Sequence, residues 1–451
     1  MGATALKVTA IFGGPGTGKT TALADLYAKA VEKYGADKVA FVSYTRRQVN
    51  RGRTAAHKKV KVKGKKKEKE LFKTLHSLSK TSYGNDDVRV FDRKQVSLMS
   101  EYLGQDMLSV ARGIDFMKNV MTKNDAVGAN RAGLDSRTFQ KYRVFYDSVK
   151  KGKSERLGDA KVIDFADMLQ NAVESRMKVD VKAAFVDEAQ DLSPLQWRAV
   201  YTFFRDAEEL YVAGDPNQAL YGFAGAAVNY MLEMKCDETI VLDKSHRCSI
   251  PVMEMAEKVW NRMEAKAALP SDNRSDNGFA VFYPQCDIRR MFLNPILASV
   301  EKGYKVMVLA NTHERLYAIK KAFGTKNWEF PCSFYSGRKK FRWKNGRAAT
   351  LSTIHQAKGL EADYVLIDAS CGRSAERNEF GRRHERWQDY WRVIYTAITR
   401  AKRGVVVFEM SKNHLVGEPS CMEELYYAKF NYEKYERWVT QSPAGGRDNK
   451  R

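Results

Sequence analysis

A glycine-rich segment near the start of the chain, GGPGTGKT (Gly13 to Thr20), constrains the fold more than any other stretch. It fits the pattern GxxxxGK[ST] and directly follows the apolar run VTAIF, which predicts a strand leading into a loop and a helix. Glycines let backbone N–H groups approach phosphate oxygens, and the N-terminus of the following helix favours anions. We therefore predict a nucleoside triphosphate site made by Gly13, Gly14, Pro15, Gly16, Thr17, Gly18, Lys19, Thr20 and Thr21.

Short apolar runs of β-type residues recur along the chain, each followed by a turn or a helical pattern. Buried strands that alternate with helices predict an α/β protein with mainly parallel sheets. The region from about Lys80 to Leu157 is rich in helix formers and poor in such runs, which predicts a helical insertion in the first sheet domain. The runs are KVTAIFGG, KVAFVSY, KAAFVDEA, LYVAGD, ETIVLD, KVMVLAN, DYVLIDAS and GVVVFEM.

The charge balance points to a polyanionic partner, because 77 Lys and Arg residues outnumber 54 Asp and Glu residues and give a formal net charge of +23. Neutralising phosphates and releasing their counterions favours binding to nucleic acid. The six cysteines stand singly without a CxxC pair, which favours a reducing compartment over a zinc ribbon or a disulfide framework. Without a signal peptide or a long apolar run, we expect a cytoplasmic protein that does not engage a membrane.

Two adjacent carboxylates, Asp187 and Glu188, end the apolar run AAFVD in the segment AAFVDEAQD. Phosphoryl transfer uses carboxylates in this position to hold a metal ion and to polarise the attacking water. We predict that Thr20 and Asp187 ligate Mg²⁺, that Glu188 activates the water, and that Lys19 reaches the β- and γ-phosphates. Together with the phosphate loop, this pair predicts hydrolysis of a nucleoside triphosphate.

Further segments follow in a fixed order. They are FVSYTRRQ, TLHSLS, IDFADML, GDPNQALYGFAGA, VLDKSHRCS, TIHQAKGLEADYVLI and VIYTAITRAK. With the phosphate loop and DEAQD, this series resembles the motifs of the UvrD/Rep/PcrA-like helicases of superfamily 1. The resemblance covers most of the chain outside the helical region and the C-terminal tail, and it implies two RecA-like domains. We expect the first domain at 1–79 and 158–245 and the second at 246–440, and the composition of the other segments predicts a helical insertion at 80–157 and a flexible tail at 441–451.

The resemblance also implies roles for individual residues. Gln218 would couple the γ-phosphate to neighbouring DNA contacts, and Arg247 and Arg400 would supply positive charge to the transferred phosphoryl group. His246 would lie against the base, and Glu361 would bind the ribose, with Gly359 and Lys358 in the same segment. The catalytic set is therefore Lys19, Asp187, Glu188, Gln218, Arg247 and Arg400. ATP and Mg²⁺ are the expected cofactors.

Single-stranded DNA would be gripped by aromatic stacking and by basic or polar contacts to phosphates. The resemblance nominates Tyr44, Thr45, Arg46, Thr74, His76, Tyr221, Phe223 and His355 for this interaction. For each aromatic residue the alternative interpretation is packing in the core, and His355 has the same alternative. The basic run HKKVKVKGKKKEKE, from His57 to Glu70, is read either as a solvated loop or as a phosphate-tracking loop.

Several departures from the family pattern affect these expectations. The family's upstream glutamine segment is missing, which leaves adenine selectivity open, and Phe223 and Ala224 replace a common tryptophan and arginine. Relatives insert a large accessory domain between segments that here correspond to Thr312 and Thr353, and the chain is too short there to hold it. The stretch SFYSGRKKFRWKNGR at 333–347 lies in this interval, and we expect a DNA-binding hairpin carrying Arg338, Lys339, Lys340, Arg342 and Trp343. The alternative is a solvated loop.

These observations predict an ATP-dependent, Mg²⁺-requiring translocase and helicase acting on single-stranded and tailed duplex DNA, with 3′-to-5′ polarity by resemblance. We expect a monomer during translocation, with replication or recombination proteins as partners, and the compact length favours a viral or mobile-element origin. Three alternatives stay open. They are an ATP-driven remodeller that displaces proteins from DNA, an RNA-directed or 5′-to-3′ motor, and a binding module without catalysis.

Overall fold

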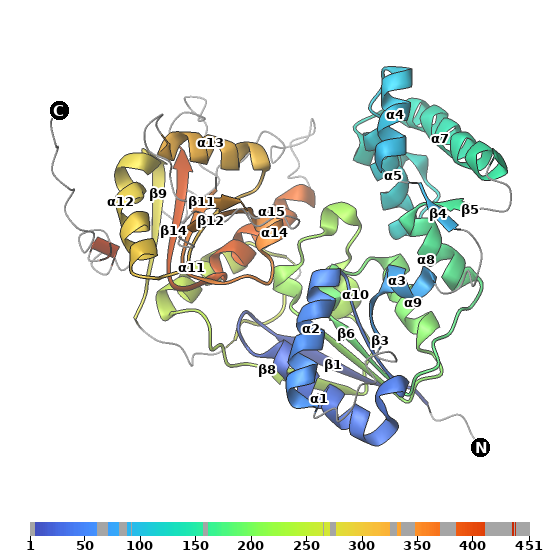
Figure 1. Ribbon diagram of the computed structural model, residues 1–451, viewed down its shortest axis with the longest axis horizontal. Helices are drawn as coiled ribbons and strands as arrows, with labels where there is room; N and C mark the ends of the chain where they lie inside the picture. Colours follow the sequence, from blue (N-terminus) through green and yellow to red (C-terminus); the bar gives the residue numbers. More distant parts are fainter. Residues whose placement is uncertain are drawn as a thin grey trace. The chain divides into compact units, whose positions relative to one another are not determined.

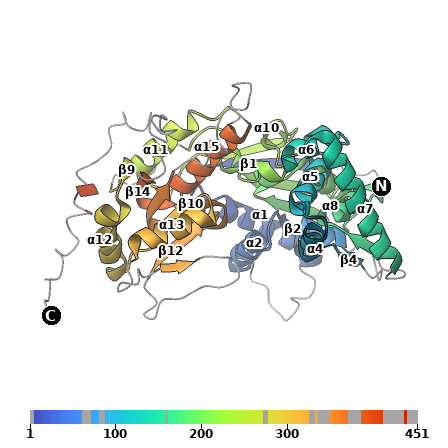
Figure 2. The ribbon, with the colours of Figure 1, turned by 90° about the horizontal axis from the view of Figure 1, so that it is seen from above.

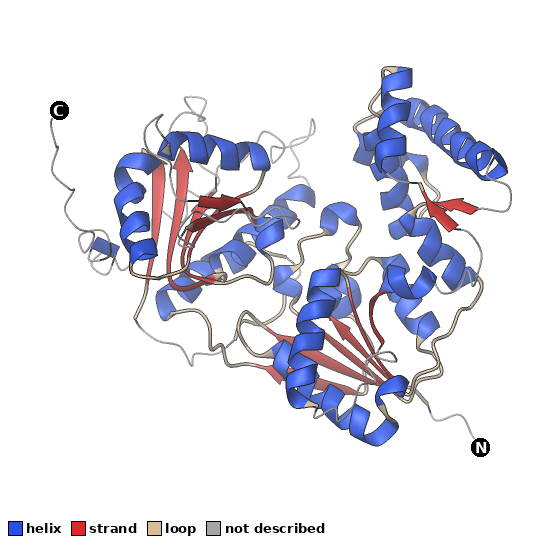
Figure 3. Ribbon diagram, viewed as in Figure 1, coloured by secondary structure: helices blue, strands red, loops and turns tan. Residues whose placement is uncertain are grey.

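The computed structural model describes residues 5–60, 71–80, 88–91, 93–156, 161–264, 266–270, 277–324, 332–334, 348–369, 385–410, 435–436 and 438. The chain divides into two units, each with a six-stranded parallel sheet flanked by helices (Figures 1 and 3). The first unit comprises Met1–Gly13 and Gly18–Leu242, and the second comprises Gly14–Thr17 and Asp243–Arg451. The predicted α/β fold with parallel sheets is confirmed.

The first unit has its strands in the order β3-β2-β6-β7-β1-β8, and every neighbouring pair is parallel. A separate parallel pair, β4-β5, adjoins the helices that precede α8. The elements are β1 (Lys7–Gly13), α1 (Lys19–Tyr34), η1 (Ala36–Lys38), β2 (Val39–Ser43), α2 (Arg46–Lys59), β3 (Leu71–Thr74), α3 (Leu75–Ser79), β4 (Val88–Val90), α4 (Arg93–Leu103), α5 (Met107–Asn119), α6 (Asp125–Ala132), α7 (Ser136–Arg156), β5 (Lys161–Ile163), α8 (Phe165–Glu174), β6 (Ala183–Asp187), η4 (Ala189–Asp191), α9 (Pro194–Phe203), β7 (Glu209–Gly214), η5 (Pro216–Gln218), η6 (Gly222–Ala224), α10 (Val228–Leu232) and β8 (Glu238–Leu242).

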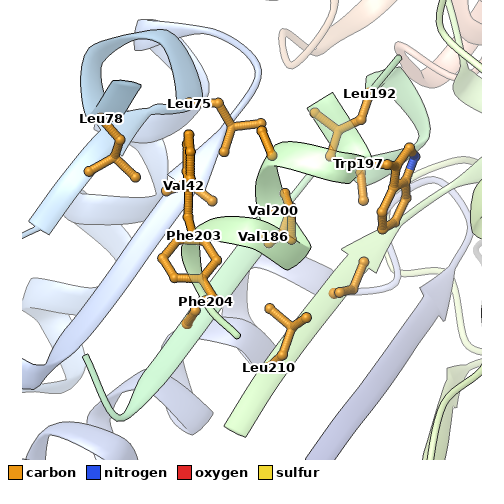
Figure 4. Packing of buried hydrophobic residues seen from close by; sticks show 14 of the residues in the cluster. Val42, Leu75, Leu78, Val186, Leu192, Trp197, Val200, Phe203, Phe204 and Leu210 are labelled. Atoms are coloured by element: carbon orange, nitrogen blue, oxygen red, sulfur yellow. The ribbon is translucent and has the colours of Figure 1, made fainter. Parts of the chain in front are cut away.

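Successive side chains of the central strands point to opposite faces of the sheet, so the core of this unit is divided between those two faces. On β2, Phe41 joins Leu23 and Tyr27 of α1, whereas Val42 packs with the residues of α3 and α9 on the other face. Figure 4 shows this second face, where Val42 and Val186 meet Trp197, Val200, Phe203 and Phe204. Because β2 and β6 are buried along their whole length, their sequences read as continuous apolar runs.

Helices α5, α6 and α7 form a separate hydrophobic cluster within the first unit, and α5 lies beside α8 (Figures 1 and 2). Gly113 of α5 and Gly128 of α6 allow the close approach. A Cβ atom on Gly113 would lie 2.5 Å from the carbonyl oxygen of Gly128, and one on Gly128 would lie 2.5 Å from Cζ of Phe139. Two glycines and one fully buried ring therefore define how these helices pack.

The second unit has the strand order β11-β12-β10-β13-β14-β9, again with parallel neighbours throughout. Its central strand β10 is fully buried, and α12 and α13 contribute Phe292, Ile319 and Phe323 to its core. The elements are α11 (Ile250–Trp260), β9 (Phe279–Cys286), α12 (Ile288–Glu301), β10 (Val306–Ala310), α13 (His313–Phe323), β11 (Cys332–Phe334), β12 (Ala349–Thr353), α14 (Ile354–Ala357), β13 (Ala362–Asp368), α15 (Glu385–Ile398) and β14 (Ala401–Met410).

Three predicted features lie largely outside the described residues. They are the basic hairpin beyond Phe334, with Arg338, Lys339, Lys340, Arg342 and Trp343, the lysine run 61–70, and the tail 441–451. Among the helices that the structure describes, none combines the length and the apolar character needed to cross a bilayer.

Candidate nucleotide and nucleic-acid site

The predicted phosphate loop connects β1 to α1 at the carboxyl edge of the first sheet. Gly16 and Gly18 have φ angles of 75° and 88°, which L-residues with a side chain rarely adopt. Gly18 caps α1, so Lys19 is its first helical residue, and its Nζ donates to the carbonyl oxygen of Gly13 at 2.5 Å. The lysine therefore folds back over the loop, beside the backbone N–H groups at the helix start.

The carboxylate pair lies at the end of β6, the strand that pairs with β2 on one side and β7 on the other. Asp187 is 3% exposed, and one of its carboxylate oxygens accepts from the N–H of Glu188 at 3.0 Å. Glu188 has a φ of 59°, which is unfavourable for a residue with a Cβ atom. Conformations of this kind persist where the surroundings enforce them, commonly at functional sites.

A hydrogen-bonded chain joins the carboxylate pair to the segment GDPNQ. Gln190 donates from Nε2 to Glu188 at 2.6 Å and accepts at Oε1 from the N–H of Asp215 at 3.0 Å. The amide of Gln218 donates in turn to the carboxylate of Asp215. Gln190, Asp215 and Gln218 are all buried, so this chain holds Gln218 close to Glu188. No role was predicted for Gln190 or Asp215 from the sequence, although both follow the ends of central strands.

Two buried carboxyl groups, those of Asp187 and Asp215, lie at or directly after the ends of neighbouring strands at this edge of the sheet. Burial, reinforced by the neighbouring Glu188, raises the pKa of Asp187 to about 7, while Lys19 and Arg51 act in the opposite direction. Burial also raises the pKa of Asp215, again with Lys19 opposing the shift. Burial, rather than an excess of negative charge, is therefore the main reason that the pKa values of Asp187 and Asp215 are raised. The structure brings Lys19, Asp187, Glu188 and Gln218 together in one unit.

Three aromatic side chains form a group that includes Tyr221, three residues after Gln218. The rings of Tyr44 and Tyr221 have centroids 4.6 Å apart, and those of Tyr221 and Phe223 are 5.8 Å apart. Phe223 is 44% exposed, whereas Tyr44 also packs against the core of the first unit. Arg47 acts electrostatically on Tyr221, so this arginine, which the sequence analysis did not nominate, lies near the aromatic group.

The remaining first-unit candidates occupy helix starts. Thr45 and Gln48 form a reciprocal capping box at the start of α2, and Thr74 caps α3 through the N–H of Ser77. Arg46 is exposed on the first turn of α2. The ring of His76 meets Phe165 edge to face at 5.8 Å, and burial lowers the pKa of His76 to about 4. Thr45 and Thr74 thus act as helix caps, in addition to the DNA contacts predicted for them.

In the second unit, Glu361 pairs with two cations. Its carboxylate lies 3.1 Å from Nε of Arg247 and 2.5 Å from Nζ of Lys402. Arg400 is buried, and its Nε donates to the carbonyl oxygen of Thr396 at 3.0 Å. The structure therefore places Arg247 and Glu361 together and adds Lys402, which the sequence analysis missed.

The loop tip Gly14–Thr17 belongs to this second unit. The hydroxyl of Ser245 donates to the carbonyl oxygen of Pro15 at 2.7 Å, and the N–H of His246 donates to that of Gly16 at 3.1 Å. His355 lies on the short helix α14, and Gly359, with a φ of 80°, follows it. These contacts place the backbone of His246 next to the phosphate loop.

A cavity of about 570 Å³ lies elsewhere in the first unit, among α5, α7, α8 and α9. Its lining includes Met117, Lys123, Arg143, Val173 and Arg198. None of its lining residues comes from the phosphate loop or from the carboxylate pair, so this cavity is not the predicted nucleotide site.

The described fold is α/β with parallel sheets, and its first unit carries the group of aromatic side chains and most of the predicted phosphate loop. Residues 3–239 match the model of the UvrD/REP helicase N-terminal domain, and residues 348–408 match that of the UvrD-like helicase C-terminal domain. The chain belongs to the UvrD/REP helicase family, as the order of its motifs indicated.

Individual relatives agree with this assignment. The chain is 21% identical to a probable DNA helicase of Mycoplasma pneumoniae over 90% of its own length and 81% of the relative. It is 31% identical to the ATP-dependent DNA helicase UvrD2 of Mycobacterium tuberculosis and 24% identical to the ATP-dependent DNA helicase srs2 of Schizosaccharomyces pombe. Those two matches cover 22% and 34% of this chain, and each spans only 16% of the relative.

Proposed function

We propose that this protein is an ATP-dependent translocase on single-stranded DNA that separates DNA strands, moving 3′ to 5′. The observation that carries the proposal is the chain Glu188–Gln190–Asp215–Gln218, which ends three residues before Tyr221. The same short loop thus holds a glutamine near the hydrolytic carboxylates and an aromatic residue suited to stacking on a base. A change at the γ-phosphate can reach the DNA-binding rings through one loop.

In the proposed hydrolysis, residues of the first unit act at the nucleotide. Lys19 moves from the carbonyl oxygen of Gly13 to the β- and γ-phosphates, which offer its ammonium group a stronger partner. Glu188 orients the attacking water and accepts its proton, and Gln190 holds that carboxylate in place. Gln218 faces the γ-phosphate and responds to its loss.

The donor set at this edge fits Mg²⁺. The described residues contain no group of three or more His, Cys, Asp or Glu side chains placed for a metal, and the proposed ligands are the Thr20 hydroxyl and Asp187. Such a pair suits Mg²⁺, which keeps waters and takes phosphate oxygens as its other ligands. Burial disfavours the ionised form of Asp187 and so raises its pKa, and a bound cation would stabilise that ionised form. When bound, Mg²⁺ would neutralise charge on the phosphates.

From the second unit, Arg247 and Arg400 are proposed to stabilise the transferred phosphoryl group. Arg247 would exchange its pairing with Glu361, and Arg400 its bond to Thr396, for phosphate oxygens. We assign 1–79 and 158–245 to one RecA-like domain, 80–157 to the helical insertion and 246–440 to the second RecA-like domain. ATP binding and hydrolysis would close and reopen these domains and move the strand stepwise across Tyr44, Tyr221 and Phe223.

The first experiment measures ATP hydrolysis by the purified chain with and without oligo-dT, and with an RNA of equal length. We expect oligo-dT to raise the rate at least tenfold, and Lys19→Ala to abolish hydrolysis while retaining DNA binding. Hydrolysis stimulated only by RNA would redirect the proposal to an RNA motor. DNA binding without any hydrolysis in the unaltered protein would favour a binding module.

A further inference from the structure

The helices α5 and α6 contact the loop that carries Phe223. The guanidinium carbon of Arg131, on α6, lies 5.8 Å from the centroid of the Phe223 ring and 5.7 Å from that of Phe116 on α5. One cation thus lies against two aromatic rings, one in the helical segment and one in the GDPNQALYGFAGA segment. Phe223 is 44% exposed, so its ring remains accessible to a base.

The backbone of the same loop also packs against the end of α5. A Cβ atom on Gly225 would lie 3.1 Å from Cβ of Asn119 and 3.2 Å from Cγ1 of Val120. With a φ of 90°, this glycine turns the chain directly beneath the helix. Asn119 accepts at Oδ1 from the hydroxyl of Ser193, which caps α9 shortly after the carboxylate pair.

We propose that Arg131 is a positioning residue that holds the Phe223 ring for stacking on single-stranded DNA, so that α5 and α6 set the affinity of the motor loop for DNA. This inference rests on the proposed function in naming DNA as the ligand. A stacking platform binds best when its ring is fixed before the base arrives, because less side-chain entropy is then lost. The contact of Arg131 with both rings restricts Phe223 in this way.

The strength of the cation–π contact between Arg131 and Phe223 limits how much DNA binding can change when Arg131 is replaced. A cation–π contact at an exposed site contributes ~0.5–1 kcal/mol, which corresponds to roughly 2- to 5-fold in a binding constant. Replacing Arg131 with glutamine removes the charge and keeps most of the length. We expect this variant to raise the Kd for fluorescein-labelled oligo-dT about 2- to 5-fold. Arg131→Lys, which retains a cation without the planar face, should give a smaller loss.

Two comparisons separate positioning from a direct phosphate contact. Loss of one phosphate contact lowers the slope of log K against log salt by about 0.7 for a single strand. Positioning predicts an unchanged slope and no further effect of Arg131→Gln when Phe223 is already leucine. Arg137→Gln, an exposed arginine at the start of α7, is the charge-matched control and should leave the Kd unchanged. A reduced slope, an undiminished effect in Phe223→Leu, or an unaltered Kd would each overturn the proposal.

A measurement without DNA keeps this inference separable from the proposed function. In a Phe223→Trp protein, the added indole should become more accessible to acrylamide when Arg131 is changed to glutamine. Quenching of the added indole is obtained by subtracting the fluorescence of the protein that keeps Phe223 from that of the Phe223→Trp protein. This is done once with Arg131 and once with Arg131→Gln. If accessibility rises but neither protein binds oligo-dT, the positioning contact stands and the proposed DNA ligand fails. Unchanged quenching would overturn the positioning contact itself.

Discussion

Glu188 combines a left-handed backbone conformation with a side chain held by Gln190 at 2.6 Å. Among the described residues, the other non-glycine positions with a positive φ are Met121 and Arg176. The sequence predicted the carboxylate pair from its place after an apolar strand. It could not reveal Gln190 and Asp215 as linking residues, because their importance depends on a hydrogen-bonded chain between two strands.

Glu188→Gln should retain ATP binding and lose hydrolysis. Removing a general base costs roughly 10²- to 10⁴-fold in rate, and the amide keeps the shape of the side chain. The measurement is the steady-state ATPase rate at saturating oligo-dT, together with binding of a fluorescent ATP analogue. Glu32→Gln, an exposed position on α1, serves as the control. An ATPase rate within threefold of the unaltered protein would contradict the assignment of Glu188.

The role of Glu361 can be decided by comparing nucleotides. If it binds the ribose, Glu361→Gln should raise the KM for ATP and reduce discrimination between ATP and deoxy-ATP. The ion pairs with Arg247 and Lys402 allow a different result, an equal fall in kcat with both nucleotides. That outcome would contradict the ribose assignment and indicate a role in orienting Arg247. Glu314→Gln, exposed on α13, is the control.

His76 should make stability depend on pH. Its folded-state pKa is lowered to about 4 from an ordinary value of 6.5, so the unfolded chain binds the extra proton between these values. This contribution is complete above pH 6.5 and is lost as the pH falls toward 4. Lowering the pH from 7.5 to 5 should therefore lower the Tm of the unaltered protein more than the Tm of His76→Gln.

The measurement is thermal unfolding of the unaltered protein and of His76→Gln in matched buffers. Asp187, whose pKa is raised, makes stability change with pH in the opposite sense, and subtracting one Tm from the other removes this shared contribution. His313→Gln on α13 provides a control histidine. A Tm difference between the unaltered protein and His76→Gln that stays constant from pH 7.5 to pH 5 would show that burial does not hold His76 neutral.

At the scale of elements, the central strands were predictable and the edges were less so. Each of the eight apolar runs contains a strand. Seven are largely buried, as parallel sheets covered on both faces demand, and the eighth is the largely exposed edge strand β8. The edge strand β3 has four residues, and β9 carries Pro284, so neither stands out in the pattern. The aromatic group also needed the structure, because Tyr44 and Tyr221 are far apart in sequence.

Two helical glycines should have opposite effects on stability when each is replaced by alanine. Gly113→Ala places a Cβ atom against the backbone of Gly128 and should destabilise the protein by ~1–3 kcal/mol. Gly152→Ala, on α7, meets no heavy atom within 4 Å and should stabilise it by roughly 0.5–1 kcal/mol. Chemical unfolding followed by circular dichroism checks both. A neutral Gly113→Ala would show that the helices separate easily.

At the scale of the whole molecule, each of the two units has a parallel sheet, and two family domains match the chain. In the proposed function, Gln218, Tyr221 and Phe223 of one loop in the first unit link hydrolysis to DNA binding. The motif order predicted the family, and the comparisons confirmed it. The motif order does not encode polarity or substrate, because these depend on contacts with the bound strand.

The most direct test is strand separation on duplexes that carry a single-stranded tail at either the 3′ or the 5′ end. The protein, ATP and Mg²⁺ should release the labelled strand from the 3′-tailed duplex, and Glu188→Gln should release none. Displacement of a streptavidin block from the same tails, measured in parallel, distinguishes a remodeller. Release from the 5′-tailed duplex alone, or ATP hydrolysis stimulated by DNA without release from either duplex, would contradict a 3′-to-5′ helicase.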